Sequence, residues 1–301
     1  HLAYLAEAVA SASIPLFTDY VQWASILLKA FNVPEDDFVA NLEATRVVLR
    51  DHLLPDEVPV VNTFIDAGIH QLHGEVILNR SYIDSAQPLG TLANDYLTAL
   101  LNGDRASATT LIHDAVGSGA SVRDIYLNVF QPTQYELGRL WQTNQISVAH
   151  EHYCTAATQQ IMAQLYPHLT TTPRNGYSLV AACIGGELHE MGIRMVTDFF
   201  EMAGWSTYYI GANTPTRSLI KILEQRQPNV LALSATITMH LGEVRQIINA
   251  VRANDNLKHL KIIVGGYPFN VSPRLWQEVG ADGYAQNSDQ AIEVAHSLVQ
   301  Q

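Results

Sequence analysis

The hydrophobic pattern divides the chain into a helical part and a part in which short apolar runs alternate with helices. Up to about residue 170, apolar residues recur at spacings of three and four, as on one face of a helix. Beyond it, apolar runs of strand length appear at 177–184, 207–210, 230–234, 260–264 and, more weakly, 283–285. Helical segments separate these runs. The alternation predicts an open, five-stranded parallel sheet with a flavodoxin-like or Rossmann-like fold.

The helical part itself has two regions. Residues 1–85 are interrupted by four prolines and show helical spacing near 38–49 and over 58–79, which predicts about three or four helices. Residues 88–165 have the spacing of a four-helix bundle, with helices at 89–101, 107–116, 121–142 and 148–165. A polar run at 170–176 marks the clearest boundary. We therefore expect an N-terminal helical region (1–85), a four-helix cap domain (86–172) and a sheet domain (176–301).

Charge argues against one large class of function. The 301 residues carry 29 acidic and 17 basic side chains, a formal net charge of −12. The first 85 residues hold 12 of the acids and 4 of the bases, so their net charge is −8. A nucleic-acid partner usually requires a basic surface that neutralises phosphates. We therefore expect no direct binding of nucleic acid and no DNA-binding head in this region.

The same composition predicts a cytoplasmic protein without a membrane segment. No apolar run reaches the roughly 18 residues that a membrane span needs. The first residues lack a basic segment followed by an apolar one, so no secretory signal is visible. Cys154 and Cys183 lie far apart in apolar contexts, which favours buried thiols in a reducing compartment over a disulfide.

The loops that follow the predicted strands hold the candidate chemistry, because ligands of open α/β sheets bind beyond the carboxyl ends of the strands. The first loop reads Gly-Gly-Glu-Leu-His-Glu-Met-Gly over 185–192, which is neither a GxGxxG nor a Walker loop. In it, Glu187 stands two residues before His189. At this spacing a carboxylate can hold one ring nitrogen while the other ligates a metal. From the residues alone, a solvated histidine at a helix start remains the alternative.

Three loops together resemble the cobalamin-binding domain of methionine synthase and of corrinoid proteins. The resemblance rests on Glu-x-His-x-x-Gly after the first strand, Ser-x-Thr after the third and Gly-Gly after the fourth, and it covers about residues 86–301. It implies that His189 is the lower axial ligand of cobalt, that Glu187 orients this histidine, and that Gly192 lets the chain pass close to the corrin. The cofactor's nucleotide tail would then run along Ser234, Thr236, Gly265 and Gly266.

The resemblance also carries one departure from the family. Asp is commoner than Glu at position 187, so the longer Glu187 side chain predicts a longer or water-mediated hydrogen bond to His189. The remaining predicted cofactor contacts are neighbours of these motifs: Leu188, Glu190, Met191 and Tyr267.

A second motif lies at the junction of two predicted helices, where nine residues separate Trp141 from Glu151-His152. By themselves such residues are more typical of helix packing and of a solvated helix face. Upstream of a cobalamin-binding domain they resemble the signature of the CarH-type adenosylcobalamin photoreceptors. That resemblance implies that Trp141, Val148 and Glu151 shape the adenosyl pocket, and that His152 can take the upper axial site after photolysis.

The first 85 residues depart from these photoreceptors, which begin with a basic winged-helix domain. A helical extension in this place resembles the photocobilins, similar sensors that also bind a bilin such as biliverdin. Aromatic and polar residues suited to a bilin are present, although ordinary helix packing and surface polarity explain them as well. They are Tyr4, Phe17, Tyr20, Trp23, Phe31, Arg50, His52, His70 and His73.

Together the resemblances predict a light sensor that is not an enzyme. It would bind adenosylcobalamin and change its conformation or assembly when light cleaves the cobalt–carbon bond. The implied partners are a second copy of the chain, in a homo-oligomer such as a dimer whose assembly depends on light, and an unknown signalling protein. The alternative is a corrinoid carrier that shuttles methyl groups between methyltransferases. A sensor of cobalamin itself also remains open, whereas a mutase would need a substrate barrel that these residues do not encode.

Overall fold

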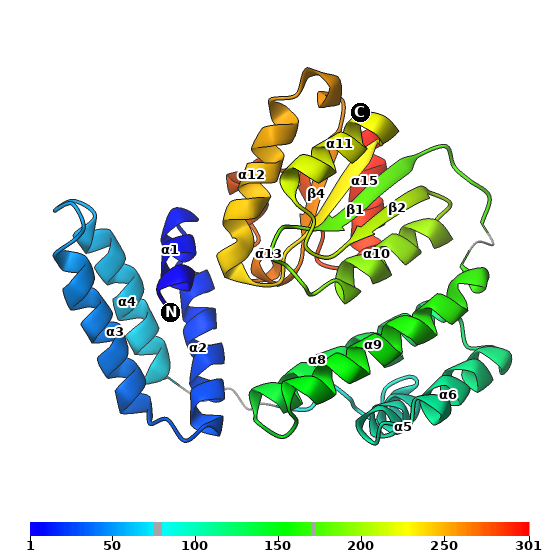
Figure 1. Ribbon diagram of the computed structural model, residues 1–301, viewed down its shortest axis with the longest axis horizontal. Coiled ribbons are helices and arrows are strands. Elements are labelled where there is room, and N and C mark those ends of the chain that lie inside the picture. Colours follow the sequence, from blue (N-terminus) through cyan, green and yellow to red (C-terminus); the bar gives the residue numbers. More distant parts are fainter. Residues whose placement is uncertain (75–79, 170–171, 301) are drawn as a thin grey trace. The chain divides into compact units, whose positions relative to one another are not determined.

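The computed structural model describes residues 1–74, 80–169 and 172–300, which form two compact units (Figure 1). The first, called the sheet unit here, contains residues 1–23, 36–73 and 172–301. The second, the cap unit, contains residues 24–35 and 74–171. Helix α2 (Ile14–Ala30) contributes to both. None of the described helices is long and apolar enough to cross a membrane.

Five parallel strands form the sheet, and they follow the apolar runs of the sequence closely. They are β1 (Ser178–Cys183), β2 (Ser206–Gly211), β3 (Val230–Ser234), β4 (Lys261–Gly265) and β5 (Gly283–Tyr284). Their order is β2-β1-β3-β4-β5, the flavodoxin-like order, in which the direction of winding reverses between β1 and β3. The predicted fold class, helices followed by a five-stranded α/β domain, is confirmed.

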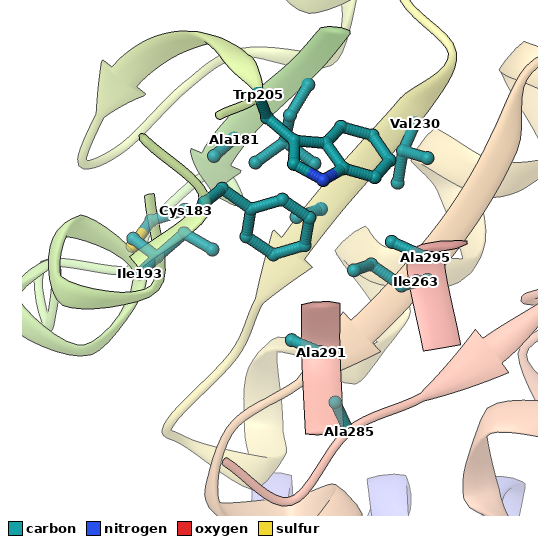
Figure 2. Packing of buried hydrophobic residues seen from close by; sticks show 12 residues of the cluster. Ala181, Cys183, Ile193, Trp205, Val230, Ile263, Ala285, Ala291 and Ala295 are labelled. Atoms are coloured by element: carbon teal, nitrogen blue, oxygen red, sulfur yellow. The ribbon is translucent and has the colours of Figure 1, made fainter. Parts of the chain in front are cut away.

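Helices α10 (Met191–Met202) and α15 (Ser288–Val299) contact each other and cover one face of the sheet. The core beneath them is built around Trp205, which is fully buried (Figure 2). Ala291 and Ala295 of α15 belong to this core, and their small side chains leave room for the indole. The indole N–H has a hydrogen-bond acceptor even in this apolar core, because it donates to Nε2 of His296 at 3.2 Å.

The sheet domain contains two further long helices and several short ones. Helices α11 (Thr216–Arg226) and α12 (Leu241–Arg252) contact each other. The remaining elements are the 3-10 helices η3 (Thr238–His240) and η4 (Asp255–Leu257) and the short helices α13 (Tyr267–Val271) and α14 (Leu275–Glu278).

The first helices of the chain pack against the sheet domain, although the helices of the cap unit lie between the two in the sequence. Helix α1 (Leu2–Ala10) contacts η3 and α4 (Val58–Leu72), and α3 (Glu35–Arg50) also lies largely in this unit. Arg245 of α12 donates to Oε2 of Glu7 at 2.8 Å and also to the Ser11 hydroxyl. Tyr4 stacks on Tyr20 with ring centroids 3.7 Å apart. Polar and aromatic contacts thus fasten α1 and the start of α2 within the sheet unit.

Four helical segments make up most of the cap unit, as the periodicity predicts. They are α5 (Gly90–Leu101), α6 (Arg105–Gly117), a third segment, and α9 (Val148–Leu165) with the 3-10 turn η2 (Tyr166–His168). The third segment runs from α7 (Val122–Ile125) through a π-helix, η1 (Tyr126–Phe130), into α8 (Gln131–Gln142). Buried Tyr96 joins α5 to α9 through a 2.9 Å hydrogen bond with Thr158.

The predicted helix boundaries need three corrections. The helix expected over 121–142 contains the π-helical turn just before Pro132, whose missing N–H cannot complete the α-helical pattern. The helix expected over 107–116 begins at Arg105, because the Asp104 side chain accepts from the Ser107 N–H and caps it. The helix expected over 58–79 ends at Leu72, and residues 75–79 lie outside the described part of the chain.

A buried ion pair in the cap unit gives a first prediction. Glu136 is 4% exposed and accepts from Arg139 at 2.6 Å and from the Tyr82 N–H at 2.9 Å. Burial alone would raise the pKa of Glu136, but these hydrogen bonds and the Arg139 charge lower it below its usual value. Glu136→Gln is therefore expected to lower the free energy of unfolding by about 2 kcal/mol at neutral pH.

The pH dependence of this effect has a definite sign. Because the folded-state pKa of Glu136 is lowered, its contribution is complete above the ordinary glutamate pKa and is lost as pH falls through the folded value. Urea unfolding of both proteins at a series of pH values measures this, and the two stabilities should converge in acid. A difference that stays constant with pH would contradict the assignment. Glu43→Gln, at a side chain 51% exposed, is the control and should change little.

Candidate functional site

The loops after β1 and β3 meet at the carboxyl edge of the sheet, where the direction of winding reverses. Strand register pairs Ser234 of β3 with Cys183 of β1 on one side and with Gly265 of β4 on the other. The three loops whose sequence motifs were singled out therefore leave from adjacent strand ends. One buried side chain, that of Glu187, links the first two of them.

One oxygen of Glu187 holds His189. Its Oε1 accepts from Nδ1 of the His189 ring at 2.5 Å and from the His189 backbone N–H at 3.1 Å. Because the carboxylate oxygen accepts, Nδ1 carries the proton, and the lone pair lies on Nε2, the nitrogen that can ligate a metal. Glu187 is fully buried, whereas the His189 side chain is 56% exposed. A buried carboxylate thus orients an accessible imidazole.

The second oxygen of Glu187 is fixed by the loop after β3. Its Oε2 accepts from the backbone N–H groups of Thr236 at 2.8 Å and Ile237 at 3.0 Å. Burial alone would raise the pKa of Glu187, but the hydrogen bonds from the His189 ring and from the Thr236 and His189 N–H groups lower it to about 2. The side chain is therefore anionic, which makes the imidazole that it holds a more basic ligand.

The expectation of a longer or water-mediated bond between Glu187 and His189 is wrong. The bond is direct, at 2.5 Å. Oε2 of Glu187 reaches the backbone of the loop after β3 while Oε1 stays on the imidazole. The carboxylate of Glu187 is therefore attached at two points.

The other predicted residues of the first loop divide between the surface and the sheet. Leu188 is 71% exposed. Glu190 instead turns toward β2, where it accepts from the Tyr209 hydroxyl at 2.8 Å. Met191 begins α10 and is partly buried. Gly192 follows it, and a Cβ added there would meet nothing within 4 Å, so the space above this glycine is open.

The residues predicted to line the nucleotide tail lie on the second and third loops. Ser234 is 8% exposed at the end of β3, and Thr236 contributes its backbone N–H to Glu187. Gly266 has a φ of 101°, and a Cβ there would lie 2.0 Å from the Ala235 carbonyl oxygen. Gly265 is less crowded, since its nearest such contact would be 3.2 Å. Close packing of the two loops therefore requires glycine at position 266, whereas Gly265 is less constrained.

Tyr267, the residue after this pair, is 52% exposed, and its hydroxyl donates to Oδ1 of Asp19 in α2 at 2.7 Å. The loop predicted to contact the cofactor tail is therefore also a contact of the N-terminal helices.

The predicted cap residues lie at the end of α8 and at the start of α9, on either side of the turn that joins these helices. Trp141 is the next-to-last residue of α8, and Val148 is the first residue of α9. Glu151 accepts from the Thr155 hydroxyl at 2.9 Å and lies 3.5 Å from Nε2 of His152, whose side chain is 74% exposed. Of these four residues, Glu151 and His152 are in contact, and Trp141 and Val148 lie on either side of the turn between the helices.

Two residues of the site were not predicted. Asn213, in the loop after β2, donates its N–H to the Glu187 carbonyl and accepts from the Gly186 N–H, both at 2.9 Å. His240, in η3, places Nδ1 3.3 Å from Oε2 of Glu187. Asparagine tolerates the left-handed backbone conformation, and Asn213 adopts it with a φ of 49°. This tolerance is the sequence signal that could have marked Asn213. No local pattern marked His240.

The thiols are both buried and reduced, as predicted. Burial, aided by nearby carboxylates, raises the pKa of Cys154 to about 11 and that of Cys183 to about 12. Cys183 donates to the His189 carbonyl oxygen at 3.6 Å, so it supports the loop without being a reactive group.

This donor set fits the cobalt of a corrinoid. The macrocycle brings four equatorial nitrogens of its own, so the protein needs to supply one axial imidazole with its tautomer fixed. His189 has this arrangement, with the buried carboxylate behind it and open space above Gly192.

Comparisons with known families agree with this fit. Residues 177–293 match the family described as "B12 binding domain", and residues 92–166 match a second family with the same description. The chain is a cobalamin-binding protein. The first match covers the sheet domain with the Glu187–His189 pair, and the second covers most of the four cap helices.

Relatives of this cobalamin-binding protein are corrinoid proteins. It is 26% identical over 166 residues to dimethylamine corrinoid protein 1 of Methanosarcina mazei, covering 55% of this chain and 74% of the relative. It is 20% identical over 217 residues to a corrinoid protein of Desulfitobacterium hafniense, covering 69% and 98%. Its fold is similar to the solved monomethylamine corrinoid protein of Methanosarcina barkeri, with a TM-score of 0.61, 19% identity and coverage of 71% and 99%.

These relatives overturn the prediction of a light sensor. They include dimethylamine corrinoid proteins, so the cap motif of Trp141, Val148, Glu151 and His152 does not make this chain a photoreceptor. Cobalamin binding stands, whereas an adenosyl upper ligand and a bound bilin stay untested predictions. The alternative reading from the sequence, a corrinoid carrier, is the one that the comparisons favour.

Proposed function

We propose that this protein is a corrinoid carrier, which holds cobalamin through His189 and presents it to methyltransferases that load and unload a methyl group. The observation that carries the proposal is the buried, anionic Glu187 bonded to Nδ1 of the accessible His189. The corrinoid proteins among its relatives support the same reading. The carrier itself would not be an enzyme, and its partners would be the donor-side and acceptor-side methyltransferases.

Each residue of the site has a separate part in this proposal. His189 would be the protein's ligand to cobalt, and Glu187 keeps the proton of His189 on Nδ1, which leaves the Nε2 lone pair available for the metal. When bound, the corrinoid supplies a cobalt that, in its reduced form, takes a methyl group from a donor and releases it to an acceptor. The open space at Gly192 would leave room for the macrocycle, and the close packing at Gly266 fixes the two loops that would hold its tail.

The proposal is tested by loading the purified protein with hydroxocobalamin. We expect one cobalamin per chain after gel filtration. After reduction to Co(II), the electron paramagnetic resonance spectrum should show the splitting of a single nitrogen from the His189 imidazole. His189→Ala should remove the splitting and weaken binding at least about tenfold. Wild-type protein that retains no cobalamin, or shows no nitrogen splitting, would overturn the binding mode.

The carrier role needs a second measurement on the loaded protein. After full reduction, carbon-13-labelled iodomethane should transfer its methyl group to the protein-bound cofactor, and the label should co-elute with the chain. A loaded protein that binds cobalamin through His189 but never takes up the label would overturn the carrier role and leave the binding mode intact.

A further inference from the structure

The carboxylate of Glu187, which holds the His189 ring, also contacts a second imidazole, that of His240. Its Nδ1 lies 3.3 Å from Oε2 of Glu187, on the oxygen that His189 does not use. Because a carboxylate can only accept, the ring of His240 donates from Nδ1. The His240 side chain is 16% exposed, compared with 56% for His189. One imidazole of the pair is therefore enclosed and the other is presented outward.

The backbone of His240 is held between two regular elements. His240 ends η3 and precedes the first residue of α12. On its other side the ring lies against Gly186, where an added Cβ would come within 3.4 Å of Nε2. The ring thus lies between Glu187 and Gly186, two residues of the loop after β1.

A glutamate needs such support more than an aspartate does. Its extra side-chain torsion gives the carboxylate more freedom to rotate, which backbone N–H groups limit at both oxygens, from Thr236 and Ile237 on Oε2 and from His189 on Oε1. The His240 ring adds a side-chain donor to Oε2. With Oε2 held by three donors, Oε1 is aimed at Nδ1 of His189.

We propose that His240 is a positioning residue for the axial ligand, which holds Glu187 in the orientation that keeps His189 directed at cobalt. This inference rests on the proposed binding of cobalamin through His189, but not on the methyl-carrier role. His240 would act through Glu187, the residue that it contacts, and not as a ligand of the metal.

The test compares His240→Ala and His240→Asn with wild-type protein, each loaded with hydroxocobalamin. Asparagine places an amide N–H near the position of Nδ1, so it should restore most of what alanine removes. We expect His240→Ala to weaken cobalamin binding about tenfold. We also expect a fraction of its Co(II) resonance signal to lack nitrogen splitting, and His240→Asn to recover the split signal. Circular dichroism of the apoproteins checks that both variants fold.

His259→Ala is the matched control, because His259 is an exposed histidine of the same domain, and it should behave as wild-type. If His240→Ala keeps the wild-type affinity and a fully split signal, the inference is wrong while binding through His189 stands. If His240→Asn is as impaired as His240→Ala, the hydrogen bond is not what matters, and the inference is also wrong. Absence of nitrogen splitting in the wild-type protein would overturn both this inference and the proposed binding mode.

Discussion

Replacing Glu187 with alanine is expected to lower the free energy of unfolding by about 3–5 kcal/mol and to weaken cobalamin binding about 100-fold. The variant removes the acceptor for the N–H groups of Thr236, Ile237 and His189, and it also frees the His189 ring to rotate. One side chain joins the two loops, so its loss affects the apoprotein and the cofactor site together.

Two measurements separate these effects. Urea unfolding of the apoprotein gives the change in stability, and absorbance titration with hydroxocobalamin gives the change in affinity. Glu201→Ala is the matched control, because Glu201 is also a buried carboxylate of this domain, bonded to Arg174 and to Thr207. It should lower stability comparably and leave the intrinsic affinity unchanged. An equal loss of affinity in both variants would show that Glu187 acts only through general stability.

The sheet could be predicted from the sequence because its central strands β1 and β3 are buried on both faces. Such strands read as continuous apolar runs, and the run at 230–234 coincides with β3 (Val230–Ser234). The Glu187–His189 pair could be predicted for a different reason, since both residues lie on one short loop and their contact is local. Both predictions therefore depended only on residues that lie close together in the sequence.

Contacts between distant segments could not be predicted in this way. His240 reaches Glu187 across 53 positions, and Asn213 meets Gly186 across 27, so only the folded sheet brings them together. The bond between Arg245 and Glu7 spans 238 positions. No periodicity encodes such pairs, because each depends on where two loops leave adjacent strands or where a helix docks.

The function was mispredicted for a related reason. The cap motif consists of a few residues at one helix junction, and Trp141 and Glu151 at that spacing also suit ordinary packing. A match of a whole domain carries far more information than such a motif.

Alanine at Gly266 and alanine at Gly192 are expected to differ sharply in their effect on the stability of the apoprotein, although both glycines belong to the cobalamin motif. At Gly266 a Cβ would lie 2.0 Å from the Ala235 carbonyl oxygen, on a backbone with a φ of 101°. Because backbone atoms on both sides must shift, Gly266→Ala should lower the free energy of unfolding of the apoprotein by about 3 kcal/mol or more. Cobalamin binding should fall as a consequence of the displaced loop.

Gly192→Ala should leave the apoprotein at least as stable, because the added methyl group meets nothing within 4 Å and alanine favours helix α10. Its effect should appear only on titration with hydroxocobalamin, as weaker binding where the methyl group enters the space left for the corrin. Thermal unfolding and absorbance titration of both variants measure the contrast. If Gly192→Ala binds cobalamin as tightly as the wild-type protein, the macrocycle does not approach this glycine, and the open space above it has another cause.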